Sequence, residues 1–199
     1  TIWFGIAPPT EAAAIGSLAA MIVALAYGKL NFKVVKETLY QTIQTTSMIY
    51  AILFLGSFFV SVFMRLGGGD VVEQALTSLP FGKWAIFAIM LSVVFILGML
   101  MDWIASLLIV VPVFTPIAAS LGFDPIWFAA MVCIMYQTSF ITPPFAPAIF
   151  YLKGVAPDTV KTSDIMKGVW PFVGLQILVI ILCTIFPELI LWLPSKIIG

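Results

Sequence analysis

The stretch Gln137-Thr138-Ser139-Phe140-Ile141-Thr142-Pro143-Pro144-Phe145-Ala146-Pro147 decides how this chain can fold. It places three hydroxyl side chains and three prolines inside a run that is otherwise apolar enough for a membrane helix. Proline removes a backbone donor and clashes with the preceding turn, so the helix is predicted to be interrupted here. In lipid, freed backbone groups are tolerated only where they face protein or a polar cavity. The interruption is therefore a candidate ion or substrate site.

The composition predicts an all-α polytopic membrane protein. Of the 199 residues, 62% are hydrophobic and 9% charged, and the mean hydropathy is +1.17, far from the values of soluble domains. Nine basic and nine acidic residues give zero net charge, which argues against a nucleic-acid partner. Histidine is absent, which excludes Ser-His nucleophilic sites and histidine-ligated zinc or haem. Cys133 and Cys183 lie in apolar segments and are predicted to pack as small hydrophobes.

The apolar runs predict helices separated by polar or glycine-rich turns. The chain starts at Thr1 without the pattern of a signal peptide, so we expect the interior of a longer protein. The predicted helices are Glu11–Tyr27, a polar surface helix around Lys29, Lys33, Lys36 and Glu37, a span Ser47–Leu66, an amphipathic helix Asp70–Leu79, two short pieces Trp84–Leu97 and Trp103–Ala119, a piece Ile126–Tyr136 that resumes over Pro144–Leu152, and a last span Val169–Leu193 with a bend at Pro171 or Pro187.

The two short pieces Trp84–Leu97 and Trp103–Ala119 can be arranged in two ways. At 1.5 Å per residue each reaches roughly 21 to 26 Å, less than a hydrocarbon core of about 30 Å. They form either two short full spans or a re-entrant hairpin whose tip, near Asp102, lies at membrane depth. The distribution of lysines does not separate these alternatives, whereas the segment length favours the hairpin.

Asp102 is the one acid in the long apolar run between Glu73 and Asp124. An ionisable residue at bilayer depth costs at least ~2.5 kcal/mol on insertion scales, which makes it a functional candidate. The simpler alternative is that Asp102 only caps the helix that opens at Trp103. The two roles are compatible.

The predicted helix ends offer binding groups of both signs. Carbonyl ends near Leu97 and Ser139 suit a sodium ion, and amide ends at Trp103 and Pro144 suit a carboxylate. The alternative for each hydroxyl is a hydrogen bond to its own helix. The candidate sodium ligands are Gly98, Met101, Asp102, Thr138, Ser139 and Thr142, and the candidate substrate-binding residues are Trp103, Ser106, Pro143 and Pro144.

Three further acidic positions are predicted to mark helix starts. Asp124-Pro125 has a capping residue followed by proline at the first helical position. Ser163-Asp164 is predicted to cap another helix. Glu11 is expected in a first helical turn, where the helix dipole stabilises it, with a substrate role as the alternative.

Four short motifs follow one another along the chain: Gly5-Ile6-Ala7-Pro8-Pro9-Thr10-Glu11-Ala12-Ala13-Ala14, Gly98-Met99-Leu100-Met101-Asp102, Leu121-Gly122-Phe123-Asp124-Pro125 and Thr142-Pro143-Pro144. Their order resembles that in the large membrane subunit of TRAP transporters, the DctM-like subunit of the ion transporter superfamily. Gln137–Phe140 and Tyr151–Pro157 resemble the branch labelled mannitol/chloroaromatic. Pro8 and Ala146 depart from the threonine and glycine usual in the family.

The resemblance implies a sodium-coupled, ATP-independent importer of organic acids in the bacterial inner membrane, and no enzyme. It implies no cofactor other than the coupling sodium ions. The implied partners are the N-terminal half of the large subunit, a small four-helix membrane subunit, a periplasmic substrate-binding protein and the lipid bilayer. The chain would be the second inverted repeat, with a re-entrant hairpin and a discontinuous helix that move as an elevator.

This resemblance implies five segments. The segments are 1–66 with scaffold helices and a surface helix, 67–82 with the interfacial helix, 83–120 with the re-entrant hairpin, 121–153 with the discontinuous helix of the transport domain, and 154–199 with a cytoplasmic loop and the last transmembrane helix.

Two other functions are considered. A membrane scaffold or assembly subunit without transport activity is the alternative function, and an intramembrane protease would need a second deep acid beside Asp102.

Overall fold

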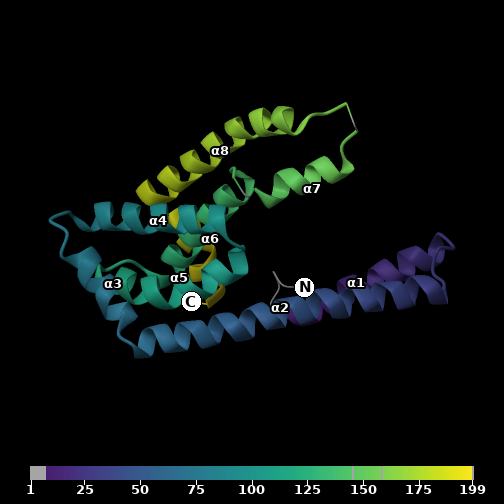
Figure 1. The fold of residues 1–199 in the computed structure, drawn as a ribbon, viewed down its shortest axis with the longest axis horizontal. Helices are drawn as coiled ribbons and strands as arrows, with labels where there is room; N and C mark the ends of the chain where they lie inside the picture. Colours follow the sequence, from purple (N-terminus) through teal and green to yellow (C-terminus); the bar gives the residue numbers. More distant parts are fainter. Residues whose placement is uncertain (1–7, 145, 158, 199) are drawn as a thin grey trace. The chain divides into compact units, whose positions relative to one another are not determined.

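The computed structural model describes residues 8–144, 146–157 and 159–198, and every regular element in these ranges is an α-helix (Figure 1). The predicted all-α class is confirmed. Residues 5–7 of the first motif lie outside the described ranges. The helices are α1 Pro9–Ala26, α2 Phe32–Arg65, α3 Gly68–Thr77, α4 Lys83–Leu100, α5 Trp103–Ser120, α6 Pro125–Ile141, α7 Pro147–Val155, α8 Thr162–Ile185 and α9 Glu188–Ile198.

The chain divides into two compact units, residues 1–51 and 52–199. The first unit contains α1, which ends before Gly28 in a left-handed conformation (φ 63°), and the start of α2. The side chain of Asn31 caps α2 by accepting the Val34 N–H at 2.9 Å. Glu11 lies in the first turn of α1, as predicted.

The prediction of a separate surface helix followed by a span at Ser47–Leu66 is wrong. Residues 32–65 form one helix of 34 residues, about 51 Å long at 1.5 Å per residue. The residues between Phe32 and Ser47 include no proline or glycine, so nothing stops the helix between its polar start and its apolar end.

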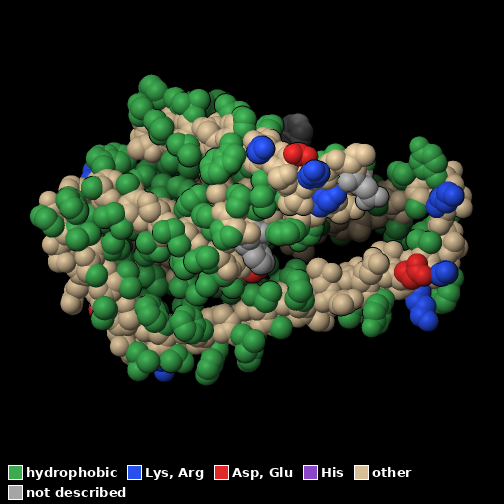
Figure 2. Space-filling model, turned by 45° about the horizontal axis from the view of Figure 1, so that its top comes forward, with side chains coloured by type: hydrophobic (Ala, Val, Ile, Leu, Met, Phe, Trp, Pro, Cys, Tyr) green, Lys and Arg blue, Asp and Glu red, His purple; other side chains and the backbone are tan. Residues whose placement is uncertain are grey.

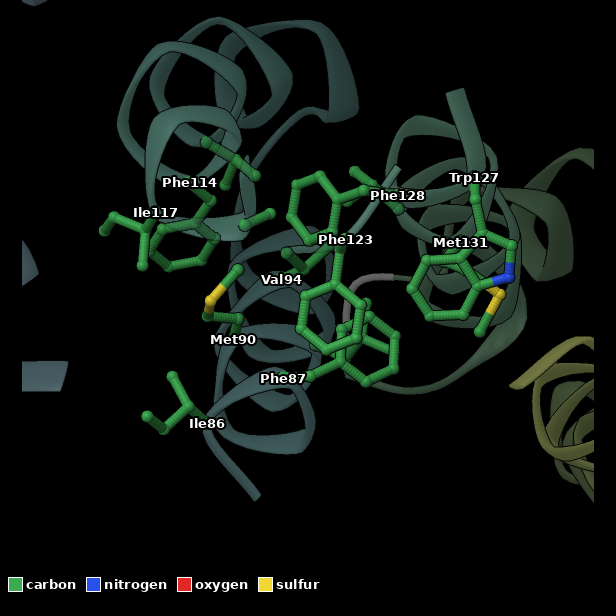
Figure 3. Close-up of a cluster of buried hydrophobic side chains, with 14 of the residues drawn as sticks. Ile86, Phe87, Met90, Val94, Phe114, Ile117, Phe123, Trp127, Phe128 and Met131 are labelled. Atoms are coloured by element: carbon green, nitrogen blue, oxygen red, sulfur yellow. The ribbon is translucent and has the colours of Figure 1, made fainter. Parts of the chain in front are cut away.

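The second unit is built around a core formed by α4, α5 and α6, which pack against one another. Their buried faces are almost entirely apolar and aromatic, and Figure 3 shows how these side chains interlock. Core residues include Ile86, Phe87, Met90 and Val94 of α4, Phe114 and Ile117 of α5, and Trp127, Phe128 and Met131 of α6.

The start of α6 confirms the predicted Asp-Pro signal. Asp124 Oδ1 accepts the N–H groups of Ile126 and Trp127 at 2.8 and 3.0 Å. One turn further in, the indole Nε1–H of Trp127 donates to the carbonyl of Cys183 at 2.9 Å, which joins α6 to α8. Cys183 is buried and Cys133 exposed, and both are free thiols.

The C-terminal helices carry a second, smaller core. Ala146, Ile149 and Ile165 are buried between the start of α7 and the start of α8. The backbone N–H of Lys161 donates to Asp164 Oδ2 at 3.2 Å, so Asp164 rather than Ser163 provides the predicted cap of α8.

The last predicted span is divided into two helices. α8 ends at Ile185 and α9 begins at Glu188, so the bend lies at Pro187. Pro171 is accommodated within α8.

Within the described residues, α2, α4, α5 and α8 are long and apolar enough to cross a membrane. Figure 2 shows apolar side chains over most of the face in view, with few charged groups among them. No residue of α2 is buried. Such extensive apolar exposure suits lipid or a partner protein rather than water.

Candidate functional site

The predicted break is present and is shorter than the motif that predicts it. α6 continues through Gln137, Thr138 and Ser139 to Ile141, and α7 begins at Pro147. Thr142 is extended (φ −97°, ψ 129°), and its N–H donates to the Ser139 carbonyl at 3.1 Å. The Pro143–Pro144 peptide bond is cis. The prolines therefore stop the helix, whereas the hydroxyl residues before them remain helical.

The three hydroxyl groups at the end of α6 are buried and donate to carbonyls of their own helix. Thr138 Oγ1 donates to Ile134 O at 2.9 Å, Ser139 Oγ to Tyr136 O at 2.8 Å, and Thr142 Oγ1 to Thr138 O at 2.7 Å. This is the arrangement predicted by the simpler alternative of local hydrogen bonding. A hydroxyl that donates its proton keeps oxygen lone pairs that can face a cation.

A second interruption lies between α4 and α5, which are joined by Met101 and Asp102 alone. The Met101 N–H donates to Leu97 O at 2.9 Å and closes α4. Asp102 Oδ1 accepts the Ile104 N–H at 2.9 Å and caps α5, so the predicted capping role is confirmed. Asp102 is exposed, and within the described ranges its Oδ2 accepts no hydrogen bond.

Gly98 brings the two interruptions together. A Cβ built on Gly98 would overlap Ser139 Oγ and would lie 3.0 Å from Tyr136 Cδ1. The last turn of α4 therefore lies directly on the last turn of α6. Both turns end in carbonyls without helical partners, which carry partial negative charge.

Two cavities lie beside this junction. One of about 330 Å³ is lined by Asp102, Trp103 and Phe140, together with α7. The other, of about 370 Å³, also contacts Trp103 and Phe140 and reaches Gln137 and Cys133. The walls are mainly aromatic, and Asp102 supplies the carboxylate.

The predicted residues divide into two groups. Asp102 and Trp103 share a cavity, and Gly98 contacts Ser139. Ser106 is fully buried, and its Oγ lies 2.8 Å from the Tyr136 hydroxyl, so it faces protein rather than a cavity. Pro143 is partly buried and Pro144 exposed, and neither is among the described residues that line the cavity of Asp102.

Sequence reasoning missed the aromatic walls of this region. Pro147, Phe150 and Tyr151 of α7 line the cavity that contains Asp102. Their spacing of three and four residues places them on one helix face, which is the signal that could have found them. Tyr136 was missed too, because its partner Ser106 is 30 positions away. Within the described ranges, no three His, Cys, Asp or Glu side chains converge, so a cation here would rely on Asp102 and neutral oxygens.

Residues 1–189 match the family described as "Tripartite ATP-independent periplasmic transporter, DctM component". The chain belongs to the DctM family. The described residues include four span-length helices. As a member of this family, the chain is therefore a multi-pass membrane protein of the TRAP transporter permease class, and the family consists of transporters rather than enzymes.

Curated DctM relatives show similar levels of identity. The chain is 29% identical over 193 residues to the 2,3-diketo-L-gulonate TRAP transporter large permease protein YiaN of Escherichia coli, covering 96% of the chain and 45% of the relative. It is 28% identical over 203 residues to the sialic acid TRAP transporter large permease protein SiaM of Vibrio cholerae, covering 100% and 46%. The C4-dicarboxylate permease DctM of Vibrio cholerae is 27% identical over 219 residues, with 100% and 48% covered. The chain thus spans just under half the length of these relatives.

Proposed function

We propose that this chain is the C-terminal part of the large permease of a sodium-coupled TRAP importer of small organic acids in the bacterial inner membrane. The substrates in the names of these relatives, diketogulonate, sialic acid and C4-dicarboxylates, all contain a carboxylate group, which supports an acid substrate for this chain. A periplasmic binding protein would deliver the substrate, and a small four-helix membrane subunit and the N-terminal half of the permease would complete the membrane complex. The resemblance to the mannitol/chloroaromatic branch belongs to this proposal.

The observation that carries the proposal is the contact between Gly98 and Ser139. It joins the interruption at Met101–Asp102 to the one that follows Ile141, so the carbonyl ends of α4 and α6 lie beside the α6 hydroxyls, and Asp102 lines an adjacent cavity. Helix interruptions of this kind are how secondary transporters build ion sites inside a membrane. We therefore assign sodium to the oxygens of Gly98, Met101 and Asp102 on one side, and of Thr138, Ser139 and Thr142 on the other.

The substrate assignment uses the cavity next to this junction. Trp103 opens α5 and lines the cavity, and free amides at helix starts favour a carboxylate. Pro143 and Pro144, in the break before α7, are proposed to contact the substrate beside Trp103. Ser106 is buried against Tyr136 and would support this region from within the protein. In this proposal α4 and α5, which only two residues join, form a re-entrant hairpin. The alternative is two short full spans, since 18 residues each give about 27 Å. The hairpin and the broken helix α6–α7 would move together as an elevator.

Sodium dependence of uptake tests the proposal. We expect Asp102→Asn, in the complete transporter in proteoliposomes, to raise the sodium concentration for half-maximal uptake about tenfold, a loss of 1.4 kcal/mol. Asparagine keeps the capping oxygen, so the fold should persist. Thr142→Ala should act in the same direction. Asp164→Asn, which changes a capping acid at α8, is the matched control, and an unchanged sodium curve for Asp102→Asn would sink the assignment.

The alternative is a membrane scaffold, which is favoured by one observation. All three hydroxyls at the end of α6 are satisfied within their own helix, as packing alone would require. Cysteines placed at Met101 and Thr142 distinguish the two functions. In a transporter their reaction with a water-soluble thiol reagent should change with sodium and substrate, whereas in a scaffold both should stay equally protected under all conditions.

A further inference from the structure

Apart from the proposed transport site, a pocket with one basic and one acidic side chain lies at the start of α4 and α6. It has a volume of about 220 Å³. Lys83, the first residue of α4, and Asp124, the cap of α6, both line it. The one ion pair within 4.0 Å in the described part of the chain is Lys33–Glu37, so Lys83 and Asp124 share the pocket without forming a salt bridge.

The ammonium group of Lys83 lies beside two aromatic rings that line the same pocket. Its Nζ lies 5.6 Å from the ring centre of Trp84 and 5.3 Å from that of Phe123. These distances are within the range of cation–π attraction. Trp127 anchors the same cluster, because its ring packs against Phe123 at 5.5 Å and its N–H is bound to α8. The charge therefore lies against a packed group of rings.

One carboxylate oxygen of Asp124 is available to a ligand. Oδ1 accepts two backbone N–H groups of α6, whereas Oδ2 accepts no hydrogen bond from the described residues. The pocket consequently presents a cation for an anionic group and a free acceptor for a group that donates protons.

An apolar groove of about 430 Å³ shares Trp84 with this pocket. Its α4 wall follows Trp84, Ala88 and Leu91, spaced along one helix face, and its opposite wall is the end of α8. α4 and α8 each pack on α6, which forms the floor. The hydroxyls of Ser92 and Thr184 in this groove donate to their own helices, so the groove offers a bound molecule an essentially hydrocarbon surface.

We infer that the pocket and the groove together bind one phospholipid with a primary ammonium headgroup, such as a phosphatidylethanolamine. The phosphate pairs with Lys83, the headgroup ammonium donates to Asp124 Oδ2, and an acyl chain lies along the groove between α4 and α8. Separate positive and negative groups match a zwitterion, and aromatic side chains with a lysine are typical of the membrane interface. A choline headgroup has no N–H to donate to Asp124, which makes the site selective. This inference depends on membrane insertion alone and is independent of sodium coupling.

Lipid-dependent thermal stability of the delipidated full-length permease in detergent tests the inference. We expect palmitoyl-oleoyl phosphatidylethanolamine to raise Tm more than the phosphatidylcholine or phosphatidylglycerol with the same chains. Lys83→Met, which keeps the apolar stem over the rings, should remove most of the shift, and Lys83→Arg should retain it. Asp124→Asn keeps the capping oxygen and should abolish the preference over phosphatidylcholine.

Two control variants distinguish the contribution of the lipid headgroup from that of its acyl chain. Ala88→Phe fills the groove and should reduce the response to all three lipids, whereas Lys36→Ala, on α2 in the other unit, should leave it unchanged. Equal responses to the three lipids in the wild type, or a full response in Lys83→Met, would overturn the inference. So would the absence of any lipid response, which would mean that protein covers the groove.

Discussion

Gly98 of α4 and Ser139 of α6 are in such close contact that a methyl group at position 98 would overlap the Ser139 hydroxyl oxygen. The serine cannot simply turn away, because it is buried and its hydroxyl donates to Tyr136 O at 2.8 Å. The absence of a side chain at Gly98 therefore sets how closely the two helix ends approach. The same approach defines the proposed sodium site.

Gly98→Ala is expected to destabilise the detergent-purified permease. Alanine normally improves a helix interior by up to about 1 kcal/mol, but overpacking at this contact costs typically 1–3 kcal/mol. We expect a lower Tm in a thermal unfolding assay. Gly174→Ala in α8 is the matched control, because a Cβ there meets nothing within 4 Å, and its Tm should stay equal or rise.

Ser139→Ala tests the cause of that loss. It removes the oxygen that the new methyl group overlaps, so Gly98→Ala/Ser139→Ala should be more stable than the sum of the two single effects. Purely additive changes in Tm would show that the contact is looser than described.

The hydrogen bond between Ser106 and Tyr136 is expected to act as a pair. The two hydroxyl oxygens lie 2.8 Å apart in a buried region between α5 and α6. Removal of either partner leaves the other unsatisfied, at a cost of about 1–3 kcal/mol. Tyr136→Phe and Ser106→Ala should therefore each lower the free energy of unfolding, and the double variant should lose less than their sum.

Chemical denaturation of the wild type, the two single variants and the double variant measures the coupling energy between Ser106 and Tyr136. Ser92→Ala is the control, because the Ser92 side chain is exposed and its hydroxyl donates to Ala88 O within α4. Coupling indistinguishable from zero would contradict a paired role for Ser106 and Tyr136.

Features set by neighbouring residues could be predicted from the sequence. The caps at Asp102 and Asp124 and the stop at the proline pair all depend on groups within a few positions of each other. The boundary of α2 was missed because a polar start and an apolar end look like two elements. Only the lack of proline or glycine between them makes one helix.

The parts of the site that depend on packing between distant residues could not be predicted. Gly98 and Ser139 were expected in one sodium site because each lies near a helix end, but they belong to different helices and no periodicity predicts their direct contact. The placement of Tyr151 beside Asp102 depends on the path of the chain through the break. The sequence thus indicated which oxygens were candidate sodium ligands. The residues of other helices that lie beside them follow only from three-dimensional packing.

Ala146 is expected to tolerate glycine unusually well. Its φ of 29° lies in the left-handed region that favours glycine, and such a conformation costs other residues about 1 kcal/mol or more. Relief of this cost should offset the loss of a buried methyl group, so Ala146→Gly should leave Tm nearly unchanged. Ala148→Gly, inside α7, should lower the free energy of unfolding by about 1 kcal/mol and so lower Tm. An equal decrease of Tm in the two variants would show that the backbone at Ala146 is not strained.

Gln176 carries a buried side-chain oxygen, Oε1, that has no hydrogen-bond partner among the described residues. An unsatisfied buried acceptor costs about 1–3 kcal/mol, and methionine has similar length without the amide. Gln176→Met should therefore raise the Tm of the detergent-purified permease. Gln74→Met, at an exposed position of α3, is the control and should leave Tm unchanged. A lower Tm for Gln176→Met alone would show that the amide finds a partner in the assembled permease, and would sink this prediction.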